Sequence, residues 1–146
     1  MKQRLDWDEY FLAIASIVSS RSTCLRRHYG AVIVKDNIIV STGYNGAASG
    51  EPNCCDLGYC ERNRLNIPKG ERYELCKAVH AEQNAIINGD PVKMKGATIY
   101  IVGIEVENGE LASGAPCMMC ERVIKNAHIK KIIYYEKDGS IIEKEP

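Results

Sequence analysis

The first regular pattern of apolar residues lies near the start of the chain. Apolar side chains recur there every three or four residues and so share one face of a helix: Phe11, Ile14, Ala15 and Val18. Asp6 stands before this stretch and Glu9 follows three residues later, which is the spacing of a helix-capping box. The pattern predicts an amphipathic helix from about Trp7 to Ser20 with a buried apolar face.

Short runs of β-branched residues predict strands further along the chain. Residues 31–34 and 38–42 are two such runs, and the polar residues between them predict a hairpin. The later elements are a helix over 79–89, a strand over 97–106 with a return strand after Asn108-Gly109, a helix over 116–126 and a strand over 131–135. Pro116 suits the first turn of its helix. A strand, a helix and a strand in succession favour a parallel pair, so we expect an α/β fold.

Between about residues 43 and 78 this regular pattern is interrupted. The stretch is rich in Gly, Asn, Pro, Cys and charged residues and has no sustained period. A segment of that length without regular structure inside a compact domain is usually functional or tied down. The chain of 146 residues is long enough for one domain core. We therefore expect a single domain, 1–146, with a cysteine-rich insertion at about 43–78.

Charge and composition narrow the classes of function. Nineteen Lys and Arg balance nineteen Asp and Glu, so a broad electrostatic grip on nucleic acid is not expected. No apolar run approaches the ~20 residues that cross a bilayer. Asp6, Asp8 and Glu9 stand where an export signal would have its apolar core. We expect a cytoplasmic protein with a small-molecule partner and no membrane partner.

Seven cysteines are many for a chain expected in a reducing compartment, where disulfides rarely persist. Metal ligation explains them better. They form two groups, an early one of Cys24, Cys54, Cys55, Cys60 and Cys76 and a later pair of Cys117 and Cys120. Two groups predict two metal sites.

The strongest motif joins the later pair of cysteines to a segment upstream. His80-Ala81-Glu82 followed by Pro116-Cys117-Met118-Met119-Cys120 has the form H-x-E…P-C-x-x-C, the signature of zinc deaminases. Cys117 and Cys120 are three residues apart at a predicted helix start, so both sulfurs lie on one face and the helix dipole favours thiolates. His80 completes three protein ligands, and catalytic zinc keeps its fourth position for water. The motif predicts a catalytic zinc site.

Glu82 is the predicted catalytic residue. It lies two positions after His80, about 200° around an ideal helix, so the two side chains do not naturally bind one ion. Zinc lowers the pKa of bound water towards ~7, which makes hydroxide available as the nucleophile. Removing an amino group then needs one proton taken from that water, one delivered to a ring nitrogen and one to the departing amine. A single mobile carboxyl can carry all three protons.

These motifs, with Gly43-Tyr44-Asn45-Gly46, resemble the cytidine and deoxycytidylate deaminase superfamily, and within it the deoxycytidylate (dCMP) deaminases. The resemblance covers nearly the whole chain and includes Cys24 and residues 30–34, 41–46, 53–56 and 80–86. It implies a three-layer α-β-α fold around a mixed sheet of about five strands. It also implies hydrolysis of dCMP to dUMP and ammonia by a homo-oligomer, often a hexamer.

The resemblance further implies where substrate is held. Asn45 matches a residue that contacts the sugar, the backbone at Ala81 meets the pyrimidine carbonyl, and the backbone at Ala115 meets the amino group. In this chain the segment just before Pro116, residues 103–114, is longer than in the superfamily pattern. That departure affects the contacts at the edge of the base more than the metal ligands.

The early cysteines suggest a second, structural zinc. One ion could link the end of the first helix, the insertion and the segment just before His80. The cysteines at those places are Cys24, Cys54, Cys60 and Cys76. Four thiolates make a closed structural site. The resemblance implies a second zinc at residues matching Cys24 and Cys54 and does not fix the other two ligands. Cys55 is an alternative ligand, and a buried thiol without metal is the alternative for each.

Three residues before the first strand are candidates to bind the 5′-phosphate of a nucleotide: Ser22, Arg26 and Arg27. A guanidinium there could hold a phosphate bidentately or lie on a solvated basic face. Tyr134, near the end of the last predicted strand, is a candidate to line the phosphate end, with ordinary packing as the alternative. Glu105, Glu107 and Glu110 are expected on the solvated face of a hairpin.

Two other functions stay open. The Cys-Met-Met-Cys segment is similar to tRNA adenosine deaminases, so a deaminase of tRNA adenosine or of another nucleobase is one alternative. The balanced charge of the chain is poorly suited to binding tRNA. The other alternative is a non-catalytic, zinc-stabilised interaction domain, which would leave Glu82 without a role.

Overall fold

A computed structural model describes residues 4–68 and 70–146, so Lys69 of the predicted insertion lies outside the described residues. The helices and strands in chain order are α1 (Trp7–Ser19), β1 (Arg27–Lys35), β2 (Ile38–Tyr44), β3 (Gly46–Ala47), α2 (Cys54–Leu57), α3 (Glu61–Arg64), the 3₁₀ helix η1 (Tyr73–Leu75), β4 (Ala78–Val79), α4 (Ala81–Asn88), α5 (Pro91–Met94), β5 (Thr98–Glu105), β6 (Leu111–Ala112), α6 (Met118–Asn126), β7 (Lys131–Tyr135) and β8 (Ile141–Lys144). The α/β alternation predicted from the sequence is confirmed.

One mixed sheet forms the centre of the molecule. Its strand order is β2-β1-β5-β7-β8, and β6 pairs with the end of β5. β5 and β7 run parallel, while the other neighbours in the order are antiparallel. The parallel pair is joined through α6, which is the strand, helix and strand unit that the sequence predicts.

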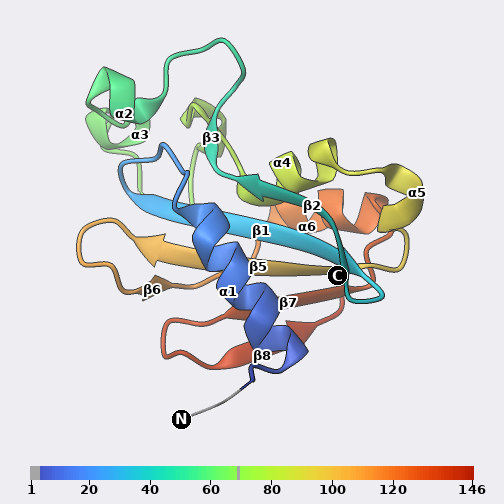
Figure 1. Ribbon diagram of the computed structural model, residues 1–146. Helices are drawn as coiled ribbons and strands as arrows, with labels where there is room; N and C mark the ends of the chain where they lie inside the picture. The colour runs from blue at the N-terminus through green and yellow to red at the C-terminus, as the bar shows by residue number, and fades with distance from the viewer. Residues whose placement is uncertain (1–3, 69) are drawn as a thin grey trace.

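Helices cover both faces of this sheet, as Figure 1 shows with α1 on one face and α4 to α6 on the other. The α1 side chains Phe11, Leu12 and Ala15 pack on one face of β1, β5 and β7. Residues of α4, α5 and α6 pack on the opposite face against alternate positions of the same strands. Because both faces are covered, the middle of β1 is a continuous buried run. The fold has the three α-β-α layers that were expected.

The ends of several elements differ from the sequence prediction. Asp6 is the N-cap of α1 and its side chain accepts a hydrogen bond from the Glu9 N–H at 2.8 Å, as predicted. The helix expected from Pro116 begins two residues later, because Cys117 takes the cap position. The helix expected from Val79 begins at Ala81, because Val79 pairs with Gly46 in a small second sheet.

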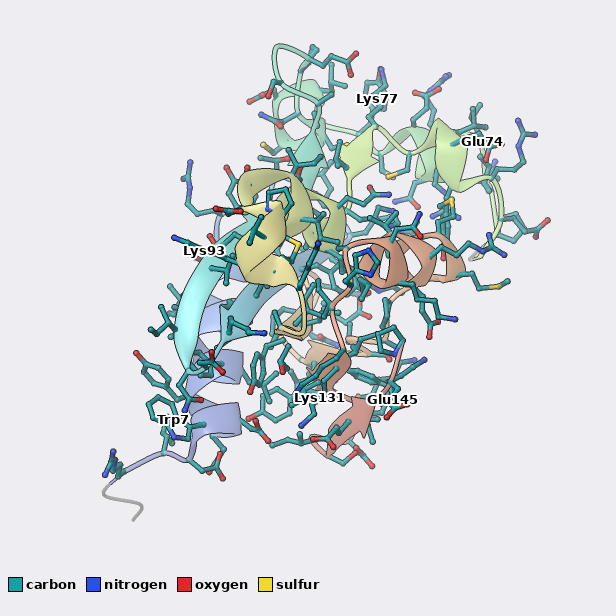
Figure 2. The ribbon with its side chains drawn as sticks, turned by 90° about the vertical axis from the view of Figure 1, so that its right-hand side faces the viewer. Trp7, Glu74, Lys77, Lys93, Lys131 and Glu145 are labelled. Atoms are coloured by element: carbon teal, nitrogen blue, oxygen red, sulfur yellow. The ribbon has the colours of Figure 1, made fainter. Side chains whose placement is uncertain are left out.

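The insertion is ordered into short elements instead of one long loop. It contains β3, α2, α3, η1 and β4, and the two strands pair with each other outside the main sheet. Figure 2 shows this region, where Glu74 and Lys77 are labelled, at the end of the molecule opposite to Trp7 and Lys131. Residues of the insertion therefore gather at the end of the molecule away from the start of α1.

Gly43 on β2 lets α4 lie unusually close to the sheet. A Cβ atom at this position would lie 2.2 Å from the Ala85 nitrogen and 2.5 Å from the Ala81 oxygen, distances that real Cβ atoms do not show. The Gly-Tyr-Asn-Gly segment thus has a packing function, because it sets the start of α4 directly against β2. Among the described residues, no helix has the length and apolar character needed to cross a membrane.

Candidate active site

Two helix starts meet at one place in the structure. His80 is the N-cap of α4 and Cys117 is the N-cap of α6. The His80 Nδ1 atom lies 3.1 Å from the Cys120 sulfur and 3.6 Å from the Cys117 sulfur. The Cys117 sulfur also accepts the Cys120 backbone N–H at 3.4 Å, which anchors it to the first turn of α6. The three side chains predicted as metal ligands are therefore brought together.

This donor set suits zinc. The ligand atoms of His80, Cys117 and Cys120 all lie within 4.8 Å of one another. Among the described residues, this is the group of His, Cys, Asp or Glu side chains placed closely enough to bind one metal ion. Zinc–sulfur bonds of about 2.3 Å and zinc–nitrogen bonds of about 2.0 Å place tetrahedral ligand atoms roughly 3.6 Å apart, close to the observed spacing. Hydrogen bonds from Cys120 and His80 lower the pKa of the Cys117 thiol to about 4, so this sulfur is a ready thiolate.

Glu82 is buried beside the metal ligands. Glu82 is only 5% exposed and lines the same cavity as His80. Burial raises the pKa of the Glu82 carboxyl, because the charged form loses its hydration. A carboxyl with a raised pKa is better suited to donating a proton than an exposed one.

A cavity of about 310 Å³ opens in front of these residues. Of the residues predicted to bind substrate, it is lined by Arg26, Arg27, Asn45, Ala81 and Ala115. Ser22 and Tyr134 lie outside the lining. The Ser22 hydroxyl accepts the Cys24 N–H at 3.3 Å, and Tyr134 is 8% exposed within the core between the sheet and α4 to α6.

Asn45 is buried at the cavity wall and is held by the backbone of β1. Its Oδ1 accepts the Tyr29 N–H at 2.8 Å, and its Nδ2 donates to the Arg27 carbonyl at 3.0 Å. These two bonds fix the amide plane. The second Nδ2 hydrogen is then the group of Asn45 that can serve a ligand.

Arg27 is less available to an anion than the sequence suggested. Its Nε donates to Glu105 Oε1 at 2.9 Å, and this hydrogen bond raises the pKa of the guanidinium. Glu105, which was expected on a solvated face, lines the cavity with Arg27 instead. Arg26 also lines the cavity and has no ion-pair partner among the described residues.

Three of the early cysteines line the same cavity. Cys24, Cys60 and Cys76 line it, and Cys54 is buried nearby. Burial, followed by the charges of Cys24, Cys60 and Cys76, raises the pKa of the Cys54 thiol. Among the described residues these early cysteines do not form a group whose ligand atoms all lie within 4.8 Å of one another, as His80, Cys117 and Cys120 do. Cys55 is exposed.

Several cavity residues were not identified from the sequence. Tyr29 comes from β1, Arg62 and Tyr73 come from the insertion, and Lys137 comes from the turn between β7 and β8. Burial raises the pKa of Tyr29 to about 12, so its hydroxyl stays protonated. The position of Tyr29, directly before the buried Gly30-to-Val34 run, is the one sequence signal that could have placed it near the site.

The sequence matches the family described as the cytidine and deoxycytidylate deaminase zinc-binding region over residues 5–136. The chain belongs to this family. It is 39% identical to the deoxycytidylate deaminase of Mycobacterium phage D29 over 137 residues, which cover 90% of this chain and 95% of the phage protein. It is 32% identical to the deoxycytidylate deaminase of Schizosaccharomyces pombe, covering 90% of this chain and 38% of that protein.

The deaminase family is also evident in the fold. The dCMP deaminase from cyanophage S-TIM5, solved in complex with dCMP and dUMP, is 25% identical and aligns with a TM-score of 0.64 over 92% of this chain and 85% of that chain. This chain spans nearly the full length of the phage D29 relative and well under half of the yeast relative. Zinc is the cofactor of the family's zinc-binding region, which contains His80, Cys117 and Cys120.

Proposed function

We propose that this protein is a zinc-dependent deaminase that hydrolyses the 4-amino group of a cytosine nucleotide, dCMP + H₂O giving dUMP + NH₃. The observation that carries the proposal is the buried Glu82 beside the His80, Cys117 and Cys120 cluster at one cavity wall. Relatives named deoxycytidylate deaminase support dCMP as the substrate. The proposal treats residues 1–146 as one catalytic domain.

His80, Cys117 and Cys120 would hold the catalytic zinc. When bound, zinc supplies Lewis-acid activation of a water molecule, whose pKa falls towards ~7 in such sites. The three ligands come from two helix starts, where the positive ends of the helix dipoles favour the thiolates. Three protein ligands leave one tetrahedral position for solvent, as in other catalytic zinc sites.

Glu82 is the proposed proton carrier. Its carboxylate accepts a proton from water, and the resulting carboxylic acid donates one to the pyrimidine ring nitrogen. The water oxygen bonds to C4 of the ring as this nitrogen is protonated. Glu82 then takes the proton of the new C4 hydroxyl and donates it to the amino group, so that the C4–N bond breaks, ammonia leaves as a neutral molecule and the C4 carbonyl remains. Burial keeps bulk water from competing for these protons, and the position of Glu82 in the first turn of α4 holds it next to His80.

Backbone groups at the two helix starts are proposed to orient the base. The Ala81 N–H belongs to the first residue of α4 and has no partner within the helix, so it can donate to the pyrimidine carbonyl. The Ala115 backbone carbonyl would accept from the amino group at the opposite edge. The Asn45 amide, fixed against β1, would donate its remaining hydrogen to the sugar.

Arg26 is the proposed first contact for the 5′-phosphate, because it lines the cavity without a carboxylate partner among the described residues. Arg27 would serve a smaller part, since Glu105 already neutralises it. Lys137, which also lines the cavity, is a further cation that a phosphate could reach. Ser22 and Tyr134 are left with local roles, a backbone hydrogen bond and core packing.

We also propose a structural zinc bound by Cys24, Cys54, Cys60 and Cys76. Cys24, Cys60 and Cys76 line one cavity and Cys54 is buried, which supports the assignment. Cys54 fits better than Cys55, because Cys54 is buried and Cys55 is exposed. A closed set of four thiolates would pin the short elements of the insertion, whose own apolar core is small.

Self-association and a cytoplasmic location are further parts of the proposal. Large apolar side chains are exposed on the helices that carry the zinc motif, where Ile87 is 72% and Met118 is 71% exposed. Such a surface suits contact with another copy of the chain. Light scattering of the purified protein would give the oligomer size. The proposed cytoplasmic location agrees with the relatives' names, which are those of nucleotide deaminases.

A substrate panel tests the proposed function. Ammonia release is measured with cytosine nucleosides and their mono-, di- and triphosphates, and with adenosine in tRNA as the competing substrate. We expect dCMP to be the best substrate. If only adenosine in tRNA is deaminated, the alternative of a tRNA adenosine deaminase is favoured. If zinc-loaded protein turns over none of the substrates, the alternative of a non-catalytic interaction domain is favoured.

A further inference from the structure

Arg62 in the insertion is a buried cation with an unusual set of partners. The residue is 5% exposed and lines the cavity. One terminal nitrogen donates to two backbone carbonyls, Pro68 at 2.8 Å and Glu71 at 2.9 Å. Its Nε is buried without a hydrogen-bond partner, and no carboxylate pairs with the side chain among the described residues. The guanidinium therefore holds the loop after α3 against that helix.

The same guanidinium touches the aromatic ring that packs on a zinc ligand. Its central carbon lies 4.7 Å from the centre of the Tyr73 ring, within the range of a cation–π contact. The Tyr73 ring in turn meets the His80 imidazole edge to face, with ring centres 6.0 Å apart and an angle of 75° between the planes. A continuous line of contacts thus runs from α3 to His80.

Cysteines of the proposed structural site flank the segment that carries Arg62 and Tyr73. Cys60 is the N-cap of α3, two residues before Arg62. Cys76 is the C-cap of η1, the 3₁₀ turn that begins with Tyr73. The segment that carries both side chains therefore lies between two cysteines that line the cavity.

We propose that Tyr73 is a positioning residue that fixes the orientation of the His80 imidazole for zinc, and that Arg62 holds Tyr73 in that position. His80 binds through Nδ1, and an imidazole that can swing away from the sulfurs binds metal less tightly. Neighbours that orient a metal-bound His are typically worth ~10- to 100-fold in metal affinity or activity. The inference rests on the zinc ligands of the proposed function and is independent of which nucleotide is the substrate.

Tyr73→Leu tests the proposal, with zinc affinity as the main measurement. Competition with a chromogenic chelator should show one zinc ion bound ~10-fold more weakly than in the wild type. The kcat for dCMP should fall by a similar factor, because His80 then holds the metal less firmly. Tyr73→Phe keeps the ring and should restore wild-type zinc affinity and kcat.

The chain contains a matched control for these variants. Arg64 also lies over a tyrosine ring, that of Tyr59, at 6.0 Å, but Tyr59 is 41% exposed and does not line the cavity. Tyr59→Leu should therefore leave zinc affinity and kcat unchanged. Arg62→Met should weaken zinc binding as Tyr73→Leu does, and combining both changes should add little to the single losses, since they act through one contact line.

Three outcomes would overturn the proposal. Wild-type zinc affinity in Tyr73→Leu would show that the ring does not position His80. A loss in Tyr73→Phe as large as in Tyr73→Leu would show that the ring contact is not the cause. An equal loss in Tyr59→Leu would point to general loosening of the insertion. If His80→Ala binds as much zinc as the wild type, the metal assignment of the proposed function fails instead, before Tyr73 is considered.

Discussion

His80 and Cys117 occupy the same structural position, the N-cap, in two helices whose starts face each other. The two residues are 37 positions apart in the chain, yet the His80 Nδ1 and Cys117 Sγ atoms lie 3.6 Å apart. Each cap has extended backbone angles, so its side chain projects from the helix end instead of along its flank. The donor atoms of the metal site are thus placed by the packing of α4 and α6.

Glu82→Gln should keep the fold and the zinc but lose most turnover. The amide has nearly the shape of the carboxyl and cannot carry protons, and general acid–base groups are typically worth ~10²–10⁴ in rate. Steady-state kinetics and elemental analysis on the same sample measure both effects. Glu107→Gln, an exposed site in the loop after β5, is the control. A rate within a few-fold of wild type for Glu82→Gln would exclude the proposed proton carrier.

Cys76→Ser should lower zinc content by about one ion per chain and reduce thermal stability, because binding of structural zinc is coupled to folding. Elemental analysis and thermal unfolding of protein purified without added metal measure these two effects. Cys55→Ser should change neither, since Cys55 is exposed. Wild-type protein with one zinc ion or none would contradict the structural site.

His80→Ala should lose the catalytic zinc and nearly all activity while keeping the second ion. Removing one of three protein ligands leaves only the two thiolates of α6 to hold the metal. Zinc content before and after dialysis, with activity measured in parallel, separates this loss from unfolding. Full activity at reduced zinc content would contradict the assignment of the catalytic site.

Arg26→Ala should raise KM for dCMP by ~10-fold or more and leave the weak activity on deoxycytidine nearly unchanged, because a charge-assisted contact to the phosphate is worth ~1.5–3 kcal/mol. Arg27→Ala should have the smaller effect of the two, since Glu105 already pairs with Arg27. Kinetics with both substrates measure the difference. An equal loss with nucleotide and nucleoside would assign Arg26 to folding or assembly.

Gly43→Ala should destabilise the fold and disturb the zinc site together. The new Cβ would lie 2.2 Å from the Ala85 nitrogen, so α4 must move away from β2, and overpacking of this kind typically costs ~1–3 kcal/mol. Gly46→Ala, where the nearest atom is the Thr23 hydroxyl at 3.2 Å, should be milder. Thermal unfolding compares the two variants. A Gly43→Ala protein as stable as the wild type would contradict the close approach of α4.

Local patterns in the sequence were sufficient for much of the fold. The first helix follows from its apolar spacing and the Asp6 cap, and the β5–α6–β7 unit follows from its order. β8 was missed because only four residues form it, and two apolar residues followed by two charged ones do not show the alternation of a strand. α5, a single turn beginning at Pro91, is too short to give a period.

The site was predictable where a motif carries its chemistry and less so where contacts are distant in sequence. His80, Glu82, Cys117 and Cys120 stand in one spaced signature, and the structure brings them together. The Arg27 and Glu105 pair joins residues 78 positions apart, because β1 and β5 are neighbours in register. No local pattern records such a pairing. The contact of Tyr73 with His80 likewise depends on the folding of the insertion.

The order of the strands also determines how the molecule can meet other chains. β8 ends one side of the sheet, and an unpaired strand edge is a potential template for adding strands from another molecule. Here the edge is only four residues long, and its charged residues Glu143 and Lys144 are tied by ion pairs to Lys131 and Glu121. Such an edge resists strand addition from another molecule at this side of the sheet.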